Sequence, residues 1–265
     1  MRQLVLAFQF LTIIPLKVKG DISEKKISQS AAFFPMVGAF QGLLAVLTAS
    51  LLIKLFPLEI TSGLVILILI ISNGGFHLDG LADTFDALAV KSSGDKTIDR
   101  NKRLSVMKDG ATGAIGVISI VMTILLKLLL LNSIFHHCPL STLYFLLFLM
   151  PVFSKWVMIP AMYHGISARQ EGLGRIFLNN IRLNLVIFSS LLTIIFCLLI
   201  AVIDRLGELI LFLILFAMLY IFSFISVKFC TRKFGGLTGD SLGAISEISE
   251  ILFLMMTSIW LQHFI

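Results

Sequence analysis

The chain contains repeated apolar stretches of about 20 residues, the length that an α-helix needs to cross the hydrocarbon core of a bilayer. Seven such stretches lie approximately at residues 32–53, 58–76, 112–131, 140–163, 184–203, 208–227 and 242–261. Hydrophobic residues make up 58% of the 265 residues and charged residues 14%, a balance that excludes an ordinary soluble domain. We predict an all-α fold, a polytopic membrane helical bundle, because lipid offers no partner to unpaired backbone groups and nothing indicates a barrel.

The N-terminal segment RQLVLAFQFLTIIPL (2–16) has the apolar length of a signal peptide. Gln9 and Thr12 interrupt it, however, and no small-residue cleavage site follows. We therefore expect a retained interfacial or re-entrant helix. No internal repeat or separate soluble region is visible, so residues 1–265 are predicted to form a single transmembrane domain. The three cysteines are widely spaced and indicate neither a disulfide framework nor a Cys-based metal site.

Lysine and arginine residues are unequally distributed between the two sets of predicted loops. All but four of the 21 precede the first span or lie in the loops after the second, fourth and sixth spans. Lys54 and Arg205 lie in the opposite loops, and Lys127 and Lys155 fall within spans. The positive-inside rule then predicts a cytoplasmic N-terminus, with the motif-bearing loops on the same side of the membrane. The net charge of +6 follows from this topology and indicates no nucleic-acid partner.

Three aspartates, Asp79, Asp83 and Asp86, directly follow the second apolar stretch. On a helix these positions form one stripe about 10 Å long. Like charges at this spacing repel, and acidic side chains near lipid are costly, so a bound cation is expected. Aligned oxygen ligands suit Mg²⁺ or Mn²⁺ together with substrate phosphates. His77 could suggest zinc, but no second His or Cys stands at ligand spacing nearby, and solvated aspartates at a helix end are the alternative.

A second acidic region lies in GLTGDSLGAISEISE (236–250), which reads as a Gly-rich turn followed by a helix start. The candidate N-cap residues are Thr238, Asp240 and Ser241. Such a helix start presents free backbone N–H groups and a positive dipole end, which favour phosphate. Glu247 and Glu250 fall on one face inside the last span, where carboxylates are candidates for function. The alternative is that they pair with a basic residue such as Lys155 for structural reasons.

Two more segments bring cations and glycines to the same predicted membrane face. In the first, Lys108 and Asp109 precede a run of glycines: Gly110, Gly113 and Gly116. In the second, Arg169 and Arg175 flank two glycines: Gly172 and Gly174. Arginine binds phosphate through paired hydrogen bonds and glycines let backbone amides approach it, although glycines in membrane helices also serve packing. Carboxylates for a divalent metal and cations for phosphate together predict phosphoryl-transfer chemistry at the cytoplasmic face.

Six motifs occur in the order and spacing of one enzyme family: FLTIIP (10–15), FFPMVG (33–38), HLDGLADTFDAL (77–88), MKDGATGAIGV (107–117), ARQEGLG (168–174) and GLTGDSLGAISEISE (236–250). Over almost its whole length the chain resembles the cobalamin synthase family, the adenosylcobinamide-GDP ribazoletransferases. The resemblance implies an enzyme of the inner (cytoplasmic) membrane, with its active site facing the cytoplasm, that joins adenosylcobinamide-GDP and α-ribazole, or α-ribazole 5'-phosphate. The products would be adenosylcobalamin, or its 5'-phosphate, and GMP, with Mg²⁺ as the cofactor. One departure is Gln170, which stands where a turn-forming residue such as proline is expected.

These expectations assign a role to each candidate residue. The predicted metal ligands are Asp79, Asp83, Asp86, Glu247 and Glu250. The predicted catalytic residues are Asp83, Asp86 and Lys108, with Asp86 as a third ligand or as the base. The predicted substrate-binding residues are His77, Asp109, Arg169, Arg175, Thr238 and Asp240.

Two other classes of membrane protein share some of these features. Buried carboxylates and glycine-broken helices also occur in cation or proton-coupled transporters, but the polar clusters here lie on one side and no inverted repeat is visible. The sequence DGLADTFD loosely resembles the CDP-alcohol phosphotransferase signature, but it lacks the Ala-Arg pair and the later Gly-x3-Asp-x3-Asp of that signature. Membrane lipid surrounds the predicted bundle, and apolar helices with small-residue faces also allow a homo-oligomer.

Overall fold

A computed structural model describes residues 2–16, 20, 22–203 and 208–264 of the chain. Within these residues the regular structure is α-helical, with one 3-10 turn and no β-strand. The first elements are α1 (Arg2–Leu11), α2 (Glu24–Ser30), η1 (Ala31–Phe33), α3 (Phe34–Leu52), α4 (Leu58–Ser72), α5 (Phe76–Ala89) and α6 (Lys96–Val106). They are followed by α7 (Ala114–His137), α8 (Leu140–His164), α9 (Leu173–Leu178), α10 (Leu183–Ile203), α11 (Glu208–Phe234) and α12 (Gly239–Phe264).

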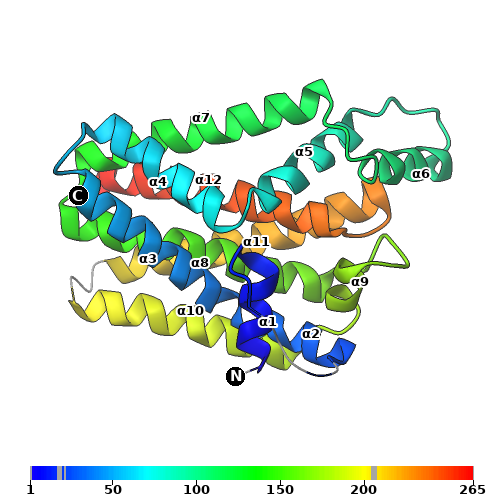
Figure 1. The fold of residues 1–265 in the computed structure, drawn as a ribbon, viewed down its shortest axis with the longest axis horizontal. Helices are drawn as coiled ribbons and strands as arrows, with labels where there is room; N and C mark the ends of the chain where they lie inside the picture. The colour runs from blue at the N-terminus through cyan, green and yellow to red at the C-terminus, as the bar shows by residue number, and fades with distance from the viewer. Residues whose placement is uncertain (1, 17–19, 21, 204–207, 265) are drawn as a thin grey trace.

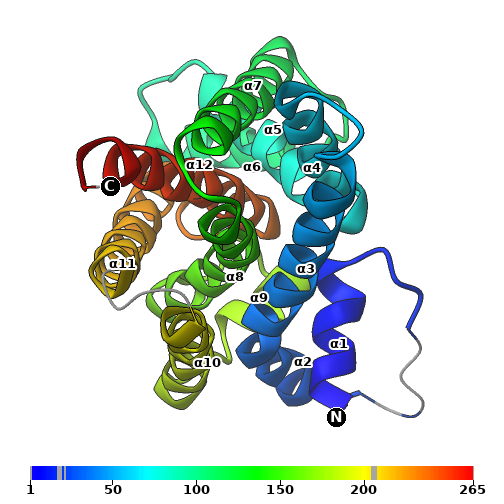
Figure 2. The same ribbon diagram turned by 90° about the vertical axis from the view of Figure 1, so that its left-hand side faces the viewer.

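Six of the described helices are long and apolar enough to cross a membrane, and a bent pair of helices supplies a candidate seventh span. The long helices run side by side along the longest dimension of the molecule (Figure 1). Figure 2 shows α8 at the centre, with α3, α7, α12, α11 and α10 around it. Accordingly, 89% of an apolar 18-residue segment of α8 is buried inside the protein. The corresponding share is 28% for α7 and for α10, which expose Leu and Ile side chains. The predicted all-α polytopic bundle is confirmed.

The second predicted span, residues 58–76, is not one straight helix. α4 ends at Ser72, and α5 leaves it at an angle of 88°. Gly74 and Gly75 have φ angles of 65° and 74°, a conformation that favours glycine, and the Asn73 side chain accepts a hydrogen bond from the Gly75 N–H at 2.9 Å. The 15 residues of α4 rise only about 22 Å, which is less than the hydrocarbon thickness. The bent pair forms either a broken span or a re-entrant loop, and α5 carries the aspartates toward one end of the bundle (Figure 1).

The predicted N-terminal helix is α1, whose ten residues rise about 15 Å and so do not span a bilayer. An aromatic side chain of α1 packs against the bundle. Phe10 stacks with Phe34 of α3 at a ring separation of 6.1 Å, and it also contacts Phe177 of α9 at 4.8 Å. α1 thus packs beside the bundle and supports α9.

The four polar segments of the sequence lie at one end of the bundle, at the right of Figure 1. We call this end, which includes α6, α9 and residues 165–172 and 235–238, the polar end. Its loops are tied together by backbone hydrogen bonds: the Ala168 N–H donates to the Leu237 carbonyl at 2.8 Å, and the Leu237 N–H donates to the Ile166 carbonyl at 2.8 Å. These bonds bring the segment after α8 against the start of α12.

α6 is held at the polar end by its own side chains. Asp95 caps its first turn and accepts from the Thr97 N–H at 2.7 Å. Asp99 accepts hydrogen bonds from Ser92 and from the backbone and side chain of Ser93, and these bonds, that of Ser92 foremost, lower the pKa of Asp99 to about 2. The Arg103 guanidinium donates to the Lys233 carbonyl at the end of α11, at 3.3 Å. α6 therefore has a fixed position from which Lys108 follows.

Candidate functional site

The site begins with an unusually close approach of α5 and α12. A Cβ atom placed on Gly80 of α5 would lie 2.7 Å from the backbone oxygen of Asp240 on α12. A Cβ atom on Gly243 of α12 would in turn lie 3.2 Å from the Cα of His77. The first contact leaves no space for a side chain at Gly80, and at Gly243 a side chain would displace its neighbour by a few tenths of an ångström. Backbone contact between the two helices places the aspartates of α5 beside the first turn of α12.

Asp79, Asp83 and Asp240 form what we call the acidic cluster. Asp83 is half-buried and is repelled by the charges of Asp79 and Asp240, while the positive charge of Arg169 offsets part of this repulsion. Arg169 makes an ion pair with Asp240, with 2.9 Å between Nη2 and Oδ2. The side chains of Asp79 and Asp83 have no hydrogen-bond or ion-pair partner in the described part of the chain. Two carboxylates one helical turn apart are therefore available to a ligand.

The fit of this cluster to a divalent metal depends on how many protein ligands the metal needs. Among the described residues, no three or more His, Cys, Asp or Glu side chains are placed together to hold an ion. Mg²⁺, however, usually keeps several waters and takes only one or two carboxylates together with substrate phosphates. Asp79 and Asp83 provide two oxygen donors of the right chemical type. The donor chemistry of this pair thus fits a magnesium ion whose remaining ligands would be water or phosphate oxygens.

Asp86 has a different environment from the other two aspartates of α5. One of its carboxylate oxygens accepts from the Gly113 N–H at 2.6 Å, and the other accepts from the Gly116 N–H at 2.7 Å. These amides belong to the start of α7, where the helix dipole is positive and favours a carboxylate. Because each oxygen accepts a backbone hydrogen bond, Asp86 has a positioning role at the start of α7, and its predicted roles of third ligand or base stay predictions.

A cavity of about 590 Å³ opens beside the acidic cluster at the polar end. We call it the cationic pocket; its lining residues are Leu104, Ser105, Lys108, Ala168, Arg169, Gln170, Glu171 and Gly172. Lys108 follows α6 and Arg169 follows α8, so the two cations come from segments far apart in the sequence. Arg169 both lines this pocket and contacts Asp240. It joins a site suited to phosphate to a site suited to a metal ion.

The other predicted substrate-binding residues take several places. Thr238 is the N-cap of α12: its hydroxyl accepts from the Ser241 N–H at 3.1 Å, and its own N–H donates to the Ser241 hydroxyl at 2.8 Å. Arg175 supports the pocket loop from α9 by donating to the Gln170 carbonyl at 2.8 Å. Asp109 is exposed and is not part of the described pocket lining. His77 is buried and belongs to a separate group of residues deeper in the bundle.

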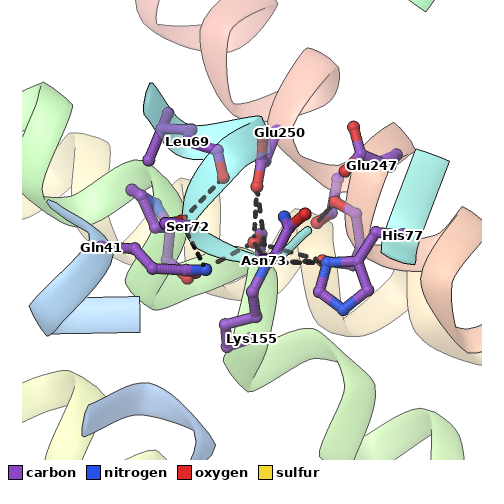
Figure 3. A network of polar contacts seen from close by, with 12 residues as sticks. Gln41, Leu69, Ser72, Asn73, His77, Lys155, Glu247 and Glu250 are labelled. Carbon is purple, nitrogen blue, oxygen red and sulfur yellow. Dashed lines mark hydrogen bonds and ion pairs between the residues drawn. The ribbon is translucent and has the colours of Figure 1, made fainter. Parts of the chain in front are cut away.

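That deeper group, which we call the buried network, contains Glu247 and Glu250 (Figure 3). Lys127 of α7 lies between them, with its Nζ atom 2.5 Å from Glu247 Oε2 and 2.6 Å from Glu250 Oε2. Lys155 of α8 adds a second positive charge, 3.6 Å from Glu250 Oε1. Two lysines thus balance two glutamates in the buried interior of the bundle.

Neutral side chains complete the hydrogen bonding of the buried network. The Ser154 hydroxyl donates to Glu250 Oε1 at 2.9 Å. Lys155 Nζ donates to the Ser246 hydroxyl at 3.0 Å and lies 3.2 Å from His77 Nδ1. A charged Lys155 can donate to this nitrogen only when His77 Nδ1 carries no proton. His77 therefore links α5 to α8 and α12 from within the bundle.

The structure favours the structural alternative that the sequence left open for the two glutamates. Glu247 and Glu250 are ion-paired and are not grouped with the aspartates of α5, so the five predicted metal ligands do not form one site. The cavity beside the buried network measures only about 20 Å³, enough for one water molecule and not for a substrate.

Sequence reasoning gave no role to Lys127. The sequence does place this lysine inside an apolar span, and a charged side chain in such a position needs a partner of opposite charge.

The described arrangement can be compared with known proteins. The sequence profile of a family described as cobalamin-5-phosphate synthase matches residues 3–258. The chain belongs to this family. No solved structure gives a significant match to the chain.

Curated members of the cobalamin-5-phosphate synthase family align with nearly the entire chain. A protein of Thermodesulfovibrio yellowstonii is 38% identical over 98% of both chains and is named adenosylcobinamide-GDP ribazoletransferase. Proteins with the same name from Caldanaerobacter subterraneus and Geotalea daltonii are 33% and 32% identical, over 98% and 96% of both chains. The acidic cluster, the cationic pocket and the buried network all lie inside the region matched to the family.

Proposed function

We propose that this member of the cobalamin-5-phosphate synthase family is a membrane-bound adenosylcobinamide-GDP ribazoletransferase. It joins adenosylcobinamide-GDP to α-ribazole, or to α-ribazole 5'-phosphate, and releases GMP. The names of the curated relatives support the reaction. The observation that carries the proposal is the position of Arg169, which lines the cationic pocket and contacts the acidic cluster through Asp240. Binding of a diphosphate and transfer of a phosphoryl group need both environments side by side.

The reaction moves one phosphoryl group. A ribose hydroxyl of α-ribazole attacks the phosphorus that is attached to the cobinamide arm, and the bond from this phosphorus to the GMP oxygen breaks. The hydroxyl proton passes to a carboxylate of the acidic cluster, and the departing GMP carries the developing negative charge. Lys108 and Arg169 of the cationic pocket stabilise that charge.

We also propose Mg²⁺ as the metal, held by Asp79 and Asp83. When bound, the ion supplies positive charge to the diphosphate oxygens and lowers the repulsion between the two carboxylates. Asp86 fixes the start of α7, and with it the glycine-rich segment after Lys108. The buried network holds α7, α8 and α12 together through opposite charges. These residues act by positioning and do not touch the reacting atoms.

The membrane placement is part of the proposal. We place the protein in the inner membrane with the polar end in the cytoplasm, and the unequal distribution of lysine and arginine supports this orientation. Both substrates would then reach the cationic pocket from the cytoplasm, with lipid around the apolar helices. The exposed apolar faces of α7 and α10 also suit either lipid or a second copy of the chain.

The test is turnover by purified protein in liposomes. With adenosylcobinamide-GDP, α-ribazole and Mg²⁺, we expect release of GMP together with formation of adenosylcobalamin. Removal of Mg²⁺ with a chelator should stop the reaction, and its return should restore it. Folded protein that releases no GMP from this mixture, or from the same mixture with α-ribazole 5'-phosphate, would overturn the proposal.

A further inference from the structure

The cationic pocket contains one acidic residue among its described lining residues, Glu171. Its side chain is exposed and has no hydrogen-bond or ion-pair partner in the described part of the chain. A carboxylate placed beside Lys108 and Arg169 opposes the binding of phosphate, because like charges repel. Glu171 therefore calls for a role other than binding phosphate.

The backbone on both sides of Glu171 is fixed. On its N-terminal side, the Ser167 hydroxyl donates to the Arg169 carbonyl at 2.7 Å. The Arg175 guanidinium donates to the carbonyl of Gln170, the residue directly before Glu171. On its C-terminal side, Gly172 turns the chain into α9 with a φ of 100°. The held backbone fixes the point from which the Glu171 side chain reaches into the pocket, and the free carboxylate is ordered when a ligand binds.

The order of groups along the site indicates what this acceptor meets. The acidic cluster contacts Arg169, Arg169 lines the cationic pocket, and Glu171 follows two residues later in the same lining. A nucleoside diphosphate group with its phosphates at Arg169 and Lys108 would have the rest of this pocket available for its nucleoside. The volume of about 590 Å³ lies in the range of small-molecule sites, about 300–1,000 Å³, and suits a nucleotide.

We infer that Glu171 recognises the guanine base of the GDP group, an inference that rests on the proposed function and deepens it. Guanine presents two parallel N–H donors, N1–H and N2–H, which match the two oxygens of one carboxylate. Charge-assisted pairs of this kind are strong and specific in geometry. Adenine presents an acceptor at N1 beside its N6 amino group, so it would meet the carboxylate with one repulsive contact. Hypoxanthine has N1–H but lacks the 2-amino group.

The test compares three nucleotides on the protein in lipid nanodiscs. Binding of GMP, IMP and AMP is measured directly for the wild type, for Glu171→Gln and for the control Glu24→Gln. Glu24 is an exposed acid on α2, which packs against α9 at the polar end but is not among the described residues of the pocket lining. We expect the wild type to bind GMP roughly tenfold to a hundredfold more tightly than AMP, with IMP between them.

Glu171→Gln should lose that preference. An amide offers guanine one acceptor and one donor in place of two acceptors, so GMP affinity falls by about tenfold or more, whereas the amide pairs well with adenine and AMP affinity is kept or rises. Glu24→Gln should behave as the wild type. A wild type that does not distinguish GMP from AMP, or a Glu171→Gln protein with an unchanged preference, would overturn the inference.

A turnover assay on the same preparations separates this inference from the proposed function. One outcome is that the protein releases GMP from adenosylcobinamide-GDP while Glu171→Gln keeps the nucleotide preference. This outcome would support the proposed function and contradict the role of Glu171 in base recognition. No turnover by the wild type, together with a GMP preference that depends on Glu171, would leave the guanine site standing and remove the proposed reaction.

Discussion

The guanidinium group of Arg169, in the loop after α8, lies 2.9 Å from the carboxylate of Asp240 in the first turn of α12. Both side chains are partly exposed, at 32% and 25%, so the pair itself contributes little to the stability of the fold. Its value lies in its location between the cationic pocket and the acidic cluster. The arginine is held where it can meet a phosphate without first being ordered by the substrate.

Replacement of Arg169 should therefore impair turnover more than stability. Arg169→Gln lacks the positive charge that would stabilise the negative charge developing on the leaving phosphate. We therefore expect kcat/KM to fall by about 10²–10³-fold. Arg169→Lys keeps the charge but loses the planar pair of donors, so its activity should lie between that of Arg169→Gln and that of the wild type. Arg182→Gln, which alters an exposed arginine directly before α10 that is not among the described residues of the pocket lining, is the control. Steady-state GMP release measures all three, and equal activity of Arg169→Gln and wild type would contradict the assignment.

The contact between α5 and α12 gives a prediction about packing. Gly80→Ala places a methyl group 2.7 Å from the Asp240 backbone, which forces the helices apart at a cost of about 1–3 kcal/mol. We expect a lower unfolding temperature in detergent and loss of turnover, because the aspartates of the two helices separate. Gly239→Ala is the matched control, since no atom lies within 4 Å of a Cβ atom at this position of α12. The prediction fails if the two alanine variants behave alike.

Sequence reasoning predicted much of the fold because the apolar stretches are long and carry their own signal. It placed the ends of α8 and α12 within a few residues and gathered the polar segments at one end. It did not foresee the break between α4 and α5, because a straight span and a broken span have the same average hydropathy. Gly74 and Gly75 were visible in the sequence, but two glycines alone do not set an angle.

The candidate site shows where sequence spacing stops being informative. Helical periodicity correctly places Asp79 and Asp83 one turn apart, but it cannot show that Asp86 meets the backbone of α7, because that contact joins residues 30 positions apart. Nor could spacing within α12 show that Glu247 and Glu250 face Lys127, which comes from another helix. Tertiary contacts decide which carboxylates remain available to a ligand.

Asp86 should control the start of α7. Asp86→Asn replaces one acceptor oxygen with an NH2 group that faces a backbone N–H, so one of the two hydrogen bonds is lost. The local cost should be about 1.5–3 kcal/mol, the usual contribution of a hydrogen bond to a charged group. Hydrogen exchange at the Gly113 and Gly116 amides should speed up accordingly, whereas exchange in α8 should stay the same. Unchanged protection of both amides would show that Asp86 does not hold this helix.

Lys127 gives a prediction that separates ion pairing from metal binding in the buried network. Lys127→Met leaves two buried carboxylates with less compensation and should destabilise the protein by about 3–5 kcal/mol. Adding Glu247→Gln should recover part of that loss, which a double-mutant cycle on unfolding free energies measures. Mg²⁺ should not selectively stabilise the Lys127→Met protein. A Mg²⁺-dependent rise in the unfolding temperature of Lys127→Met that is absent from the double variant would instead support the predicted role of the two glutamates as metal ligands.

The central claim is that the acidic cluster at the polar end carries out phosphoryl transfer beside the cationic pocket. The most direct measurement is GMP release from adenosylcobinamide-GDP by Asp83→Asn in liposomes, with α-ribazole and Mg²⁺. Glu59→Gln, which alters an exposed carboxylate in the first turn of α4, away from the polar end, is the control. The account predicts that folded Asp83→Asn releases GMP at about one-hundredth of the wild-type rate or less, while Glu59→Gln keeps the wild-type rate. GMP release by Asp83→Asn at the wild-type rate would contradict it.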